Sequence, residues 1–116
     1  MNIWIDDVRP APDGYVWCKS TNEALREIVL KNKENINLID LDHDAGDYAK
    51  DGGDFINVLQ ELERLSNKVN VVNGARMRNY WHQRCKEIIF RLHSMNPVGI
   101  ENMRRIIQRN GWIETK

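Results

Sequence analysis

Ionisable side chains follow three apolar stretches of this sequence, in each case directly where the stretch ends. The stretches are residues 3–5, 38–41 and 88–92, and the polar groups that follow them are Asp6, Asp7, Asp42, His43, Asp44, His93 and Ser94. Charged groups are costly to bury without a partner, so we expect them to end a strand rather than continue it. In open α/β sheets, ligands bind outside the carboxyl ends of the strands. If the three strands are parallel and adjacent, all these groups meet at one edge, which predicts a functional site there.

Asp6, Asp7 and Asp42 resemble the carboxylate cradle of a Mg²⁺ site. Mg²⁺ takes a few hard oxygen ligands and keeps several waters, which it shares with a phosphate group. Carboxylates on two adjacent strand ends can supply such ligands, and Mn²⁺ is the other candidate ion. The alternative is that these carboxylates only cap and hydrogen-bond the strand ends. Further aspartates could add ligands or, as loop aspartates more often do, form turns; they are Asp44, Asp47, Asp51 and Asp54.

His43 and His93 are the candidates for proton transfer, because imidazole titrates near neutral pH. One histidine at a strand end is more often a hydrogen-bonded bystander, but two at adjacent strand ends beside carboxylates support a catalytic hypothesis. Ser94 could be a nucleophile or could bind a phosphate oxygen. We favour binding, because the sequence shows no arrangement of a base and an orienting group around this serine.

Groups that could bind an anion lie near these carboxylates in the predicted fold. Asn96 and Pro97 begin a helix, with Asn as the cap and Pro at the first helical position. The free amides of Val98 and Gly99 would then lie at a helix N-terminus, which attracts phosphate. Arg9, in the loop after the first acidic pair, suits a mobile clamp on a phosphate.

The elements that must position these groups are predicted from the hydrophobic pattern. Predicted strands cover residues 2–6, 15–18, 35–42 and 87–92, and predicted helices cover residues 21–32, 55–65 and 97–109. Ser20 is the expected cap of the first helix and Asp54 that of the second. Residues 9–14 hold two prolines and an Asp-Gly turn, so no helix fits between the first two strands.

The predicted fold is α/β, a small three-layer, flavodoxin-like parallel sheet of about four strands in the order 2-1-3-4. Right-handed crossovers join the parallel strands, and this order best gathers the acidic strand ends. Compared with the full flavodoxin-like pattern, the fold lacks the first helix and the last strand. We expect the fourth strand to be an edge strand, because Ile88, Phe90 and Leu92 alternate with Glu87 and Arg91.

Residues 66–86 allow more than one interpretation. Lys68 to Val72, followed by Asn73 and Gly74, suggests a hairpin, whereas residues 75–86 could as well be helical. Residues 76–86 mix basic and aromatic side chains, as nucleic-acid contacts do. Such a stretch is more often a solvated face with anchoring aromatics, so alone it decides nothing.

Length and composition indicate one globular domain: the chain has 116 residues, of which 41% are hydrophobic and 29% charged. No apolar run approaches the roughly 20 residues of a membrane helix, and the N-terminus lacks the pattern of a secretory signal. Cys18 and Cys85 show no metal-ligand spacing. We expect them to be reduced, mostly buried thiols, and the protein to be cytoplasmic.

The charges are segregated along the chain although their sum is zero. Residues 1–63 hold 6 Lys and Arg against 14 Asp and Glu, a net −8, and residues 64–116 hold 11 against 3, a net +8. The acidic half suits a cation and the basic half an anion, or the two halves simply attract each other on folding. A wholly basic nucleic-acid face is not indicated.

Three motifs together resemble those of the cyclic-phosphate-processing receiver-like domains, a family derived from the response-regulator receiver fold. They are IDDVRPAP at residues 5–12, LDHD at residues 41–44 and HSMNPVGIENM at residues 93–103. The resemblance implies a single domain over residues 1–116, with residues 66–86 a probable insertion because they exceed the usual link. Gly53 stands where the family often has an aromatic residue.

The resemblance also implies a metal-assisted site that acts on a cyclic phosphate, at an RNA end or on a nucleotide. By motif, that site contains Asp6, Asp7, Arg9, Asp42, His43, Asp44, His93, Asn96 and Asn102. Hydrolysis of the cyclic phosphate is the predicted reaction, with Asp44 joining the two histidines and with Asn96 and Asn102 joining the phosphate-binding groups.

Two other functions remain open. An ordinary phospho-receiver would use Asp42 as phosphoacceptor, but it also needs a lysine after a fifth strand, and we expect neither that strand nor that lysine. The chain could also be a catalytically silent module that binds a nucleotide, RNA or protein. A deep pocket faced by both histidines would favour the enzyme, and outward-facing imidazoles would favour the binding module.

Overall fold

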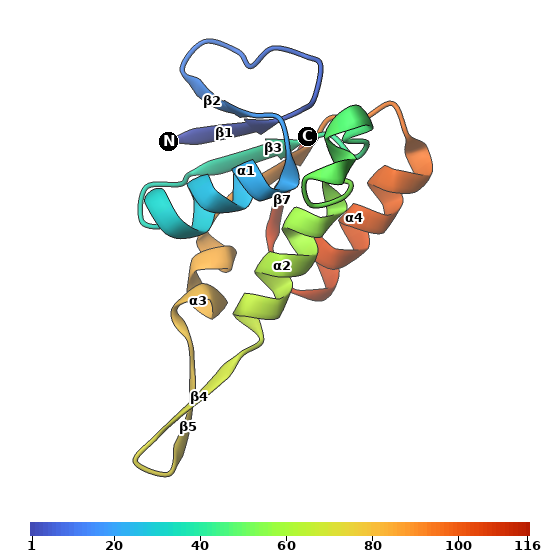
Figure 1. Ribbon diagram of the computed structural model, residues 1–116. Helices are drawn as coiled ribbons and strands as arrows, with labels where there is room; N and C mark the ends of the chain where they lie inside the picture. Colours follow the sequence, from blue (N-terminus) through green and yellow to red (C-terminus); the bar gives the residue numbers. More distant parts are fainter.

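A computed structural model describes residues 1–116 and has a five-stranded, fully parallel sheet in the order β2-β1-β3-β6-β7 (Figure 1). Its strands are β1 (Asn2–Ile5), β2 (Tyr15–Cys18), β3 (Leu38–Leu41), β6 (Ile89–Leu92) and β7 (Ile113–Thr115). The predicted α/β class and flavodoxin-like strand order are therefore confirmed.

The prediction that the last strand is missing was wrong. After the last helix, Gly111 takes a positive φ of 68° and turns the chain back, so that Trp112 stacks on Phe90 with ring centroids 5.2 Å apart. The following residues form β7, which pairs with β6. We expected β6 to be an edge strand, but it lies between β3 and β7. Lys116 directly follows β7, the fifth strand of the sheet. The three-residue β7 was too short to be recognised by its hydrophobic pattern.

The helices are α1 (Thr21–Leu25), which continues into a π-helical turn (Arg26–Lys31), α2 (Ile56–Ser66), α3 (Tyr80–Glu87) and α4 (Pro97–Arg109). Every crossover through α1, α2 or α4 advances in the same direction across the sheet, and a right-handed crossover in one direction lies on one face. These helices therefore share a face, and α2 contacts both α1 and α4 (Figure 1). The fold has two layers rather than the predicted three, because the segment before β2 is a loop.

The core lies between the sheet and this helical layer. Ile3, Ile5, Ile39, Leu41 and Phe90, which alternate along β1, β3 and β6, are completely buried. The other face of the sheet is more open: Ile89 and Ile113 are exposed there. No helix combines the length and the apolar character needed to cross a lipid bilayer.

Local signals placed most helix ends correctly. Ser20 Oγ accepts a hydrogen bond from the Glu23 amide at 3.1 Å, as a cap of α1 should. Asn96 caps α4, with Pro97 as its first residue. The expected cap of α2 was wrong, because the Asp54 carboxylate accepts instead from the Ala45 amide at 3.0 Å.

Residues 66–86 contain both structures that the sequence allowed. The strands β4 (Val69–Val72) and β5 (Ala75–Arg78) form a separate antiparallel hairpin, and α3 follows it. Asn73 and Gly74 have positive φ angles of 50° and 78°, as the two central residues of a type I′ turn require. Residues 45–53, between β3 and α2, contain a 3₁₀ turn over Gly46–Lys50.

Candidate active site at the carboxyl edge of the sheet

The sheet register brings three predicted site residues to one edge. Ile5 lies opposite Leu41, which lies opposite Leu92. The ladder continues one step beyond this row, since Asp42 N donates to Ile5 O at 2.9 Å and His93 N donates to Leu41 O at 3.0 Å. Asp6, Asp42 and His93 therefore follow neighbouring strand ends, as the sequence predicts.

Asp6, Asp7 and Asp42 form a carboxylate cluster in which one oxygen of each lies within 4.8 Å of the others. Asp6 is buried and the other two are half-buried. Partial burial raises the pKa of Asp7, and the negative charges of Asp6, Asp42 and Asp44 raise it further. Three hard oxygen donors that repel one another are a donor set that fits a small divalent cation.

Gly46 makes room for this cluster. Its φ is +54°, and a Cβ atom at this position would collide with Oδ2 of Asp7. The 3₁₀ turn can pass close to the carboxylates because it has a glycine there.

Asp6 also organises the loop that follows it. Its Oδ1 accepts hydrogen bonds from the amides of Val8 and Arg9, at 2.9 and 2.8 Å. The backbone oxygen of Arg9 in turn accepts from Trp4 Nε1 at 2.8 Å. The loop is thereby fixed at Arg9, whose exposed side chain forms no ion pair within the protein.

His93 is held between two buried carboxylates. Its Nδ1 lies 2.6 Å from Asp40 Oδ1 and its Nε2 lies 3.0 Å from Asp6 Oδ2. The ring also stacks on Trp4, with centroids 3.8 Å apart and planes 9° from parallel. Burial lowers the pKa of His93, but the hydrogen bonds and charges of Asp40 and Asp6 outweigh burial, so that the pKa is raised.

A doubly protonated imidazolium satisfies both contacts of His93, because an ionised carboxylate only accepts hydrogen bonds. No ring nitrogen of His93 is then free to exchange a proton with a substrate. This geometry favours an anchoring role for His93, which fixes Asp6, over the predicted role in proton transfer.

Asp40 is a site residue that the sequence reasoning missed. It lies within β3, is completely buried, and contacts Arg91 Nη1 at 3.4 Å as well as His93. Asp40 lies between Ile39 and Leu41, so the hydrophobic pattern did not distinguish it from the apolar strand around it. A charged residue inside a buried strand needs a partner, and that requirement was the signal that could have identified it.

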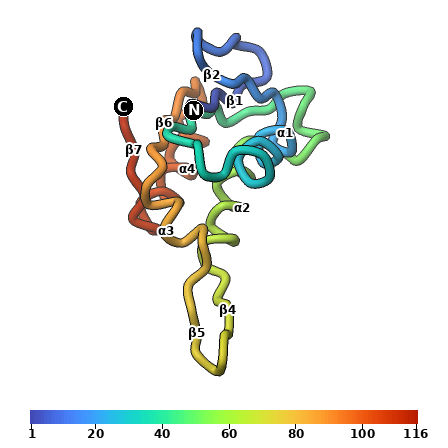
Figure 2. Tube along the Cα trace, turned by 90° about the vertical axis from the view of Figure 1, so that its left-hand side faces the viewer, coloured from blue at the N-terminus to red at the C-terminus, as the bar shows by residue number.

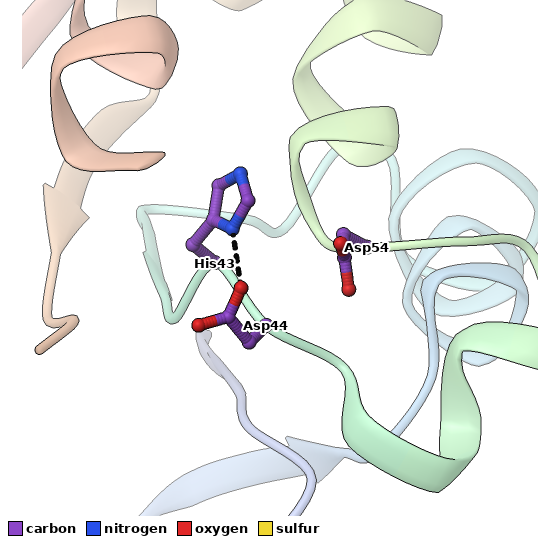
Figure 3. Close-up of side chains that lie close together, drawn as sticks. All are labelled: His43, Asp44 and Asp54. Carbon is purple, nitrogen blue, oxygen red and sulfur yellow. Dashed lines mark hydrogen bonds and ion pairs between the residues drawn. The ribbon is translucent and has the colours of Figure 1, made fainter. Parts of the chain in front are cut away.

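His43 forms a second pair, with Asp44 (Figure 3). Its Nδ1 lies 2.8 Å from Asp44 Oδ1, and the Asn96 amide nitrogen lies 3.3 Å from the same oxygen. The hydrogen bond from His43 lowers the pKa of Asp44. Gly99 packs against the flat side of the ring, where a Cβ atom would collide with it. The Nε2 atom of His43 has no hydrogen-bond partner and points away from Asp44 (Figure 3).

Asp54 brings the start of α2 to this pair, since one oxygen of its carboxylate lies within 4.8 Å of ligand atoms of His43 and Asp44 (Figure 3). Asp51 does not join it. Its carboxylate accepts from Ser20 Oγ at 2.6 Å and from Asn22 Nδ2 at 3.0 Å, and so ties the loop to α1.

The expected anion-binding groups are only partly free. The Gly99 amide, which we expected to be free, donates to Asn96 Oδ1 at 2.9 Å. Ser94 Oγ accepts from the Asn96 amide at 3.1 Å. Asn102 lies exposed on α4 and makes no hydrogen bond with any other predicted site residue. The exposed Val98 retains a free amide in the first turn of α4.

The site is an open rim rather than the deep pocket considered from the sequence. Hollows of about 440 and 480 Å³ lie elsewhere, one beside α1 and α2 and the other beside α3 and the start of β6. Neither is lined by a residue of the site. Cys18 and Cys85 are buried, unpaired thiols, as expected, and burial raises the pKa of each to about 12.

Comparison with protein families agrees with this geometry. The model of the family described as "Cyclic-phosphate processing Receiver domain" matches residues 1–109. The chain belongs to this family. The match includes the acidic strand ends, the His43–Asp44 pair and α4, and it extends through the hairpin. No curated protein and no solved structure matches the chain significantly.

Proposed function

We propose that this receiver-like domain hydrolyses a cyclic phosphate, with a divalent metal ion and His43 as its reactive groups. The observation that carries the proposal is the combination of the Asp6, Asp7 and Asp42 cluster with the adjoining His43–Asp44 pair, whose Nε2 is unpartnered. The family name supports a role in cyclic-phosphate processing. An open rim suits the end of a nucleic acid or a nucleotide.

Asp42 and Asp7 would hold the ion, Mg²⁺ or Mn²⁺, together with the one lone pair that Asp6 retains, on Oδ2. When bound, such an ion polarises the phosphoryl group and lowers the pKa of a water ligand. The chain prepares its donors in advance, because His93 fixes Asp6 and the Val8 and Arg9 amides orient it. Preorganised donors do not have to reorient during the reaction.

Arg9 and the start of α4 would bind the phosphate oxygens. The Arg9 guanidinium is exposed and unpaired, and its backbone is fixed by Asp6 and Trp4. The free Val98 amide and the Ser94 hydroxyl add neutral donors at the opposite side, at the positive end of the helix dipole. Together they would stabilise the negative charge that develops as water attacks.

His43 would transfer the proton, taking it from the attacking water and giving it to the departing ribose oxygen. Asp44 keeps the proton on Nδ1, so that the lone pair of Nε2 is available. Asn96 holds Asp44, and Gly99 lets the helix approach the ring. A positioned acid or base of this kind is worth about 10²–10⁴-fold in rate.

The test is turnover of 2′,3′-cyclic nucleotides with Mg²⁺ or Mn²⁺, comparing wild type with His43→Ala. His82→Ala is the matched control, because His82 lies on α3 and contacts Arg78 of the hairpin. We expect His43→Ala to lose about 10²–10⁴-fold in kcat and His82→Ala to keep the wild-type rate. If wild type binds a cyclic nucleotide but turns none over, the domain is a binding module.

Aspartyl-phosphate signalling is a second candidate function, favoured by the presence of β7 with Lys116 directly after it. The hydrolase proposal predicts that acetyl phosphate and Mg²⁺ leave the intact mass unchanged, because Asp42 serves as a metal ligand. A persistent phosphoryl adduct on Asp42 that is lost in Lys116→Ala would instead identify a phospho-receiver.

A further inference from the structure

The β4–β5 hairpin projects from the body of the domain as an arm (Figure 2). It comprises residues 69–78, pairs with no other strand, and is exposed at every residue. The arm contributes to the longest dimension of the molecule, 48 Å against 28 Å in the other two directions. A lone two-stranded hairpin is marginally stable and adds little to a core, so its contribution to the fold does not explain it.

All charged residues of the arm and of the segments that flank it, residues 66–86, are basic. Residues 66–86 hold five cations and no Asp or Glu. Arg84 is turned inward, where it donates to the backbone oxygens of Lys33 and Ile36. The remaining four cations form no ion pair within the protein; they are Lys68, Arg76, Arg78 and Lys86. Desolvation lowers the pKa of His82 at the base of the arm, and the charges of Arg78 and Lys86 lower it further.

The register gathers the arginines on one face of the arm. Val69 lies opposite Arg78, and Val71 lies opposite Arg76. Residues directly opposite each other in an antiparallel pair share a face, as do alternate residues along one strand. Arg76 and Arg78 therefore point to the same side of the ribbon, each beside a valine.

This arrangement suits a polyanion. Two arginines that form no ion pair, on one face of a narrow ribbon, can bind neighbouring phosphates, to which guanidinium groups bind in a bidentate manner. The aromatic residues beside the arm offer little for base stacking, since Trp81 is buried, and the exposed Tyr80 has Lys33 Nζ over its ring, 5.4 Å from the centroid, and donates its hydroxyl to Lys33 O at 3.2 Å. Contacts to phosphate without stacking give binding with little sequence preference.

We propose that the β4–β5 arm binds the phosphate backbone of a nucleic acid. This inference rests on the proposed function in one respect: the substrate that binds at the rim would be the end of a nucleic acid rather than a free nucleotide. The arm follows α2 and lies at the far end of the molecule from the 3₁₀ turn beside the site (Figure 1). It would therefore hold the body of the nucleic acid and not the reacting end.

Fluorescence anisotropy with RNA of about 20 nucleotides that ends in a 3′-hydroxyl tests the arm alone, because this probe cannot react. Single-stranded RNA, duplex RNA and duplex DNA serve as parallel probes. The variant is Arg76→Gln with Arg78→Gln, and the charge-matched control is Lys31→Gln with Arg105→Gln. Both control residues are exposed and form only loose intrahelical pairs, with Glu27 and Glu101. Thermal melting checks that both variants stay folded.

We expect the arm variant to bind about tenfold more weakly or worse, with a slope of log K against log salt that is shallower by about two. The control variant should match wild type. Equal binding by arm and control variants would overturn the proposal, as would absence of RNA and DNA binding by wild type. Arm-dependent self-association without nucleic acid binding would identify the arm as a protein contact instead.

Turnover of a cyclic mononucleotide separates this inference from the proposed function. The arm variant should keep the wild-type rate on that small substrate, because the arm is distant from the rim. An arm variant that loses nucleic acid binding but keeps normal turnover is the result that both proposals predict. If wild type binds nucleic acid through the arm but turns over no cyclic phosphate, the arm proposal is supported and the hydrolase proposal is refuted.

Discussion

The two histidines of the site differ in what their ring nitrogens face. Both nitrogens of His93 face carboxylates, and the ring is covered by Trp4. His43 uses one nitrogen to contact Asp44 and keeps the other free. Both follow a strand end, His93 directly after β6 and His43 two residues after the end of β3. Their chemistry differs because Asp40 is buried beside only one of them.

Asp40→Asn tests the anchoring role of His93. The change removes a buried charge and leaves the imidazolium with one ionised partner, so we expect the free energy of unfolding to fall by about 3 kcal/mol. We also expect the pKa of His93 to fall, because the Asp40 contact raises it. Urea denaturation and histidine NMR measure the two effects.

Asp47→Asn is the control for this change, since Asp47 is exposed and forms no ion pair. It should change stability by less than about 0.5 kcal/mol. An Asp40→Asn variant with wild-type stability and an unchanged His93 pKa would contradict the anchoring role.

Gly99→Ala tests the contact between α4 and His43. An added Cβ would collide with the imidazole ring, so the ring or the helix must shift. We expect turnover to fall by more than about tenfold, because small misplacements of a catalytic group are costly, with a shift of the His43 NMR signals. Gln108→Ala, at an exposed position of the same helix away from the site, should change neither.

At the scale of elements, an ion pair joins α2 to the end of α4 beside their apolar contacts. Arg109 Nε and Nη2 donate to the two oxygens of Glu63, each at 2.7 Å. These hydrogen bonds, with a smaller contribution from Asn110, lower the pKa of Glu63 below its ordinary value of 4.5. A carboxylate with a lowered folded-state pKa stabilises the fold above its unfolded-state pKa and loses that contribution as the pH falls through the folded-state value.

Glu63→Gln should therefore be less stable than wild type at neutral pH, and the difference should shrink as the pH falls below about 4.5. Unfolding curves over this range measure it. Glu101→Gln is the control, because Glu101 is exposed and lies 3.8 Å from Arg105. A stability difference that persists at low pH would show that Glu63 acts through packing rather than through its charge.

At the scale of the whole molecule, the acidic cluster of the site and the unpaired cations of residues 66–86 lie apart. Asp6, Asp7 and Asp42 gather at the rim, and the unpaired cations of residues 66–86 lie on and beside the arm. A divalent cation and a polyanion would therefore be drawn to different ends of one small domain.

Titration with Mn²⁺ should broaden the amide NMR signals of residues 6–9 and 42–44 and leave those of residues 69–78 sharp. The physical reason is that the three clustered carboxylates are the strongest site for a cation. Asp42→Asn should weaken the broadening, and Asp13→Asn, in the exposed loop before β2, should not. Broadening centred elsewhere, or none at millimolar Mn²⁺, would contradict the metal site.

The sequence by itself determined what depends on neighbouring residues. The caps at Ser20 and Asn96, the Asn73-Gly74 turn and the acidic strand ends are local signals, and the structure has each of them. The motifs also indicated the family before any contact was known, because they combine strand ends and a helix start in fixed order.

Only the tertiary structure decided which of these groups have partners. The short β7 pairs with β6, Asp40 contacts His93 across 53 residues, and the Gly99 amide donates to Asn96, the cap of its own helix. The two-layer architecture likewise follows from the common direction of the three helical crossovers, through α1, α2 and α4. Such contacts join residues far apart in the chain or compete for one donor, and no local pattern of residue types encodes the outcome of that competition.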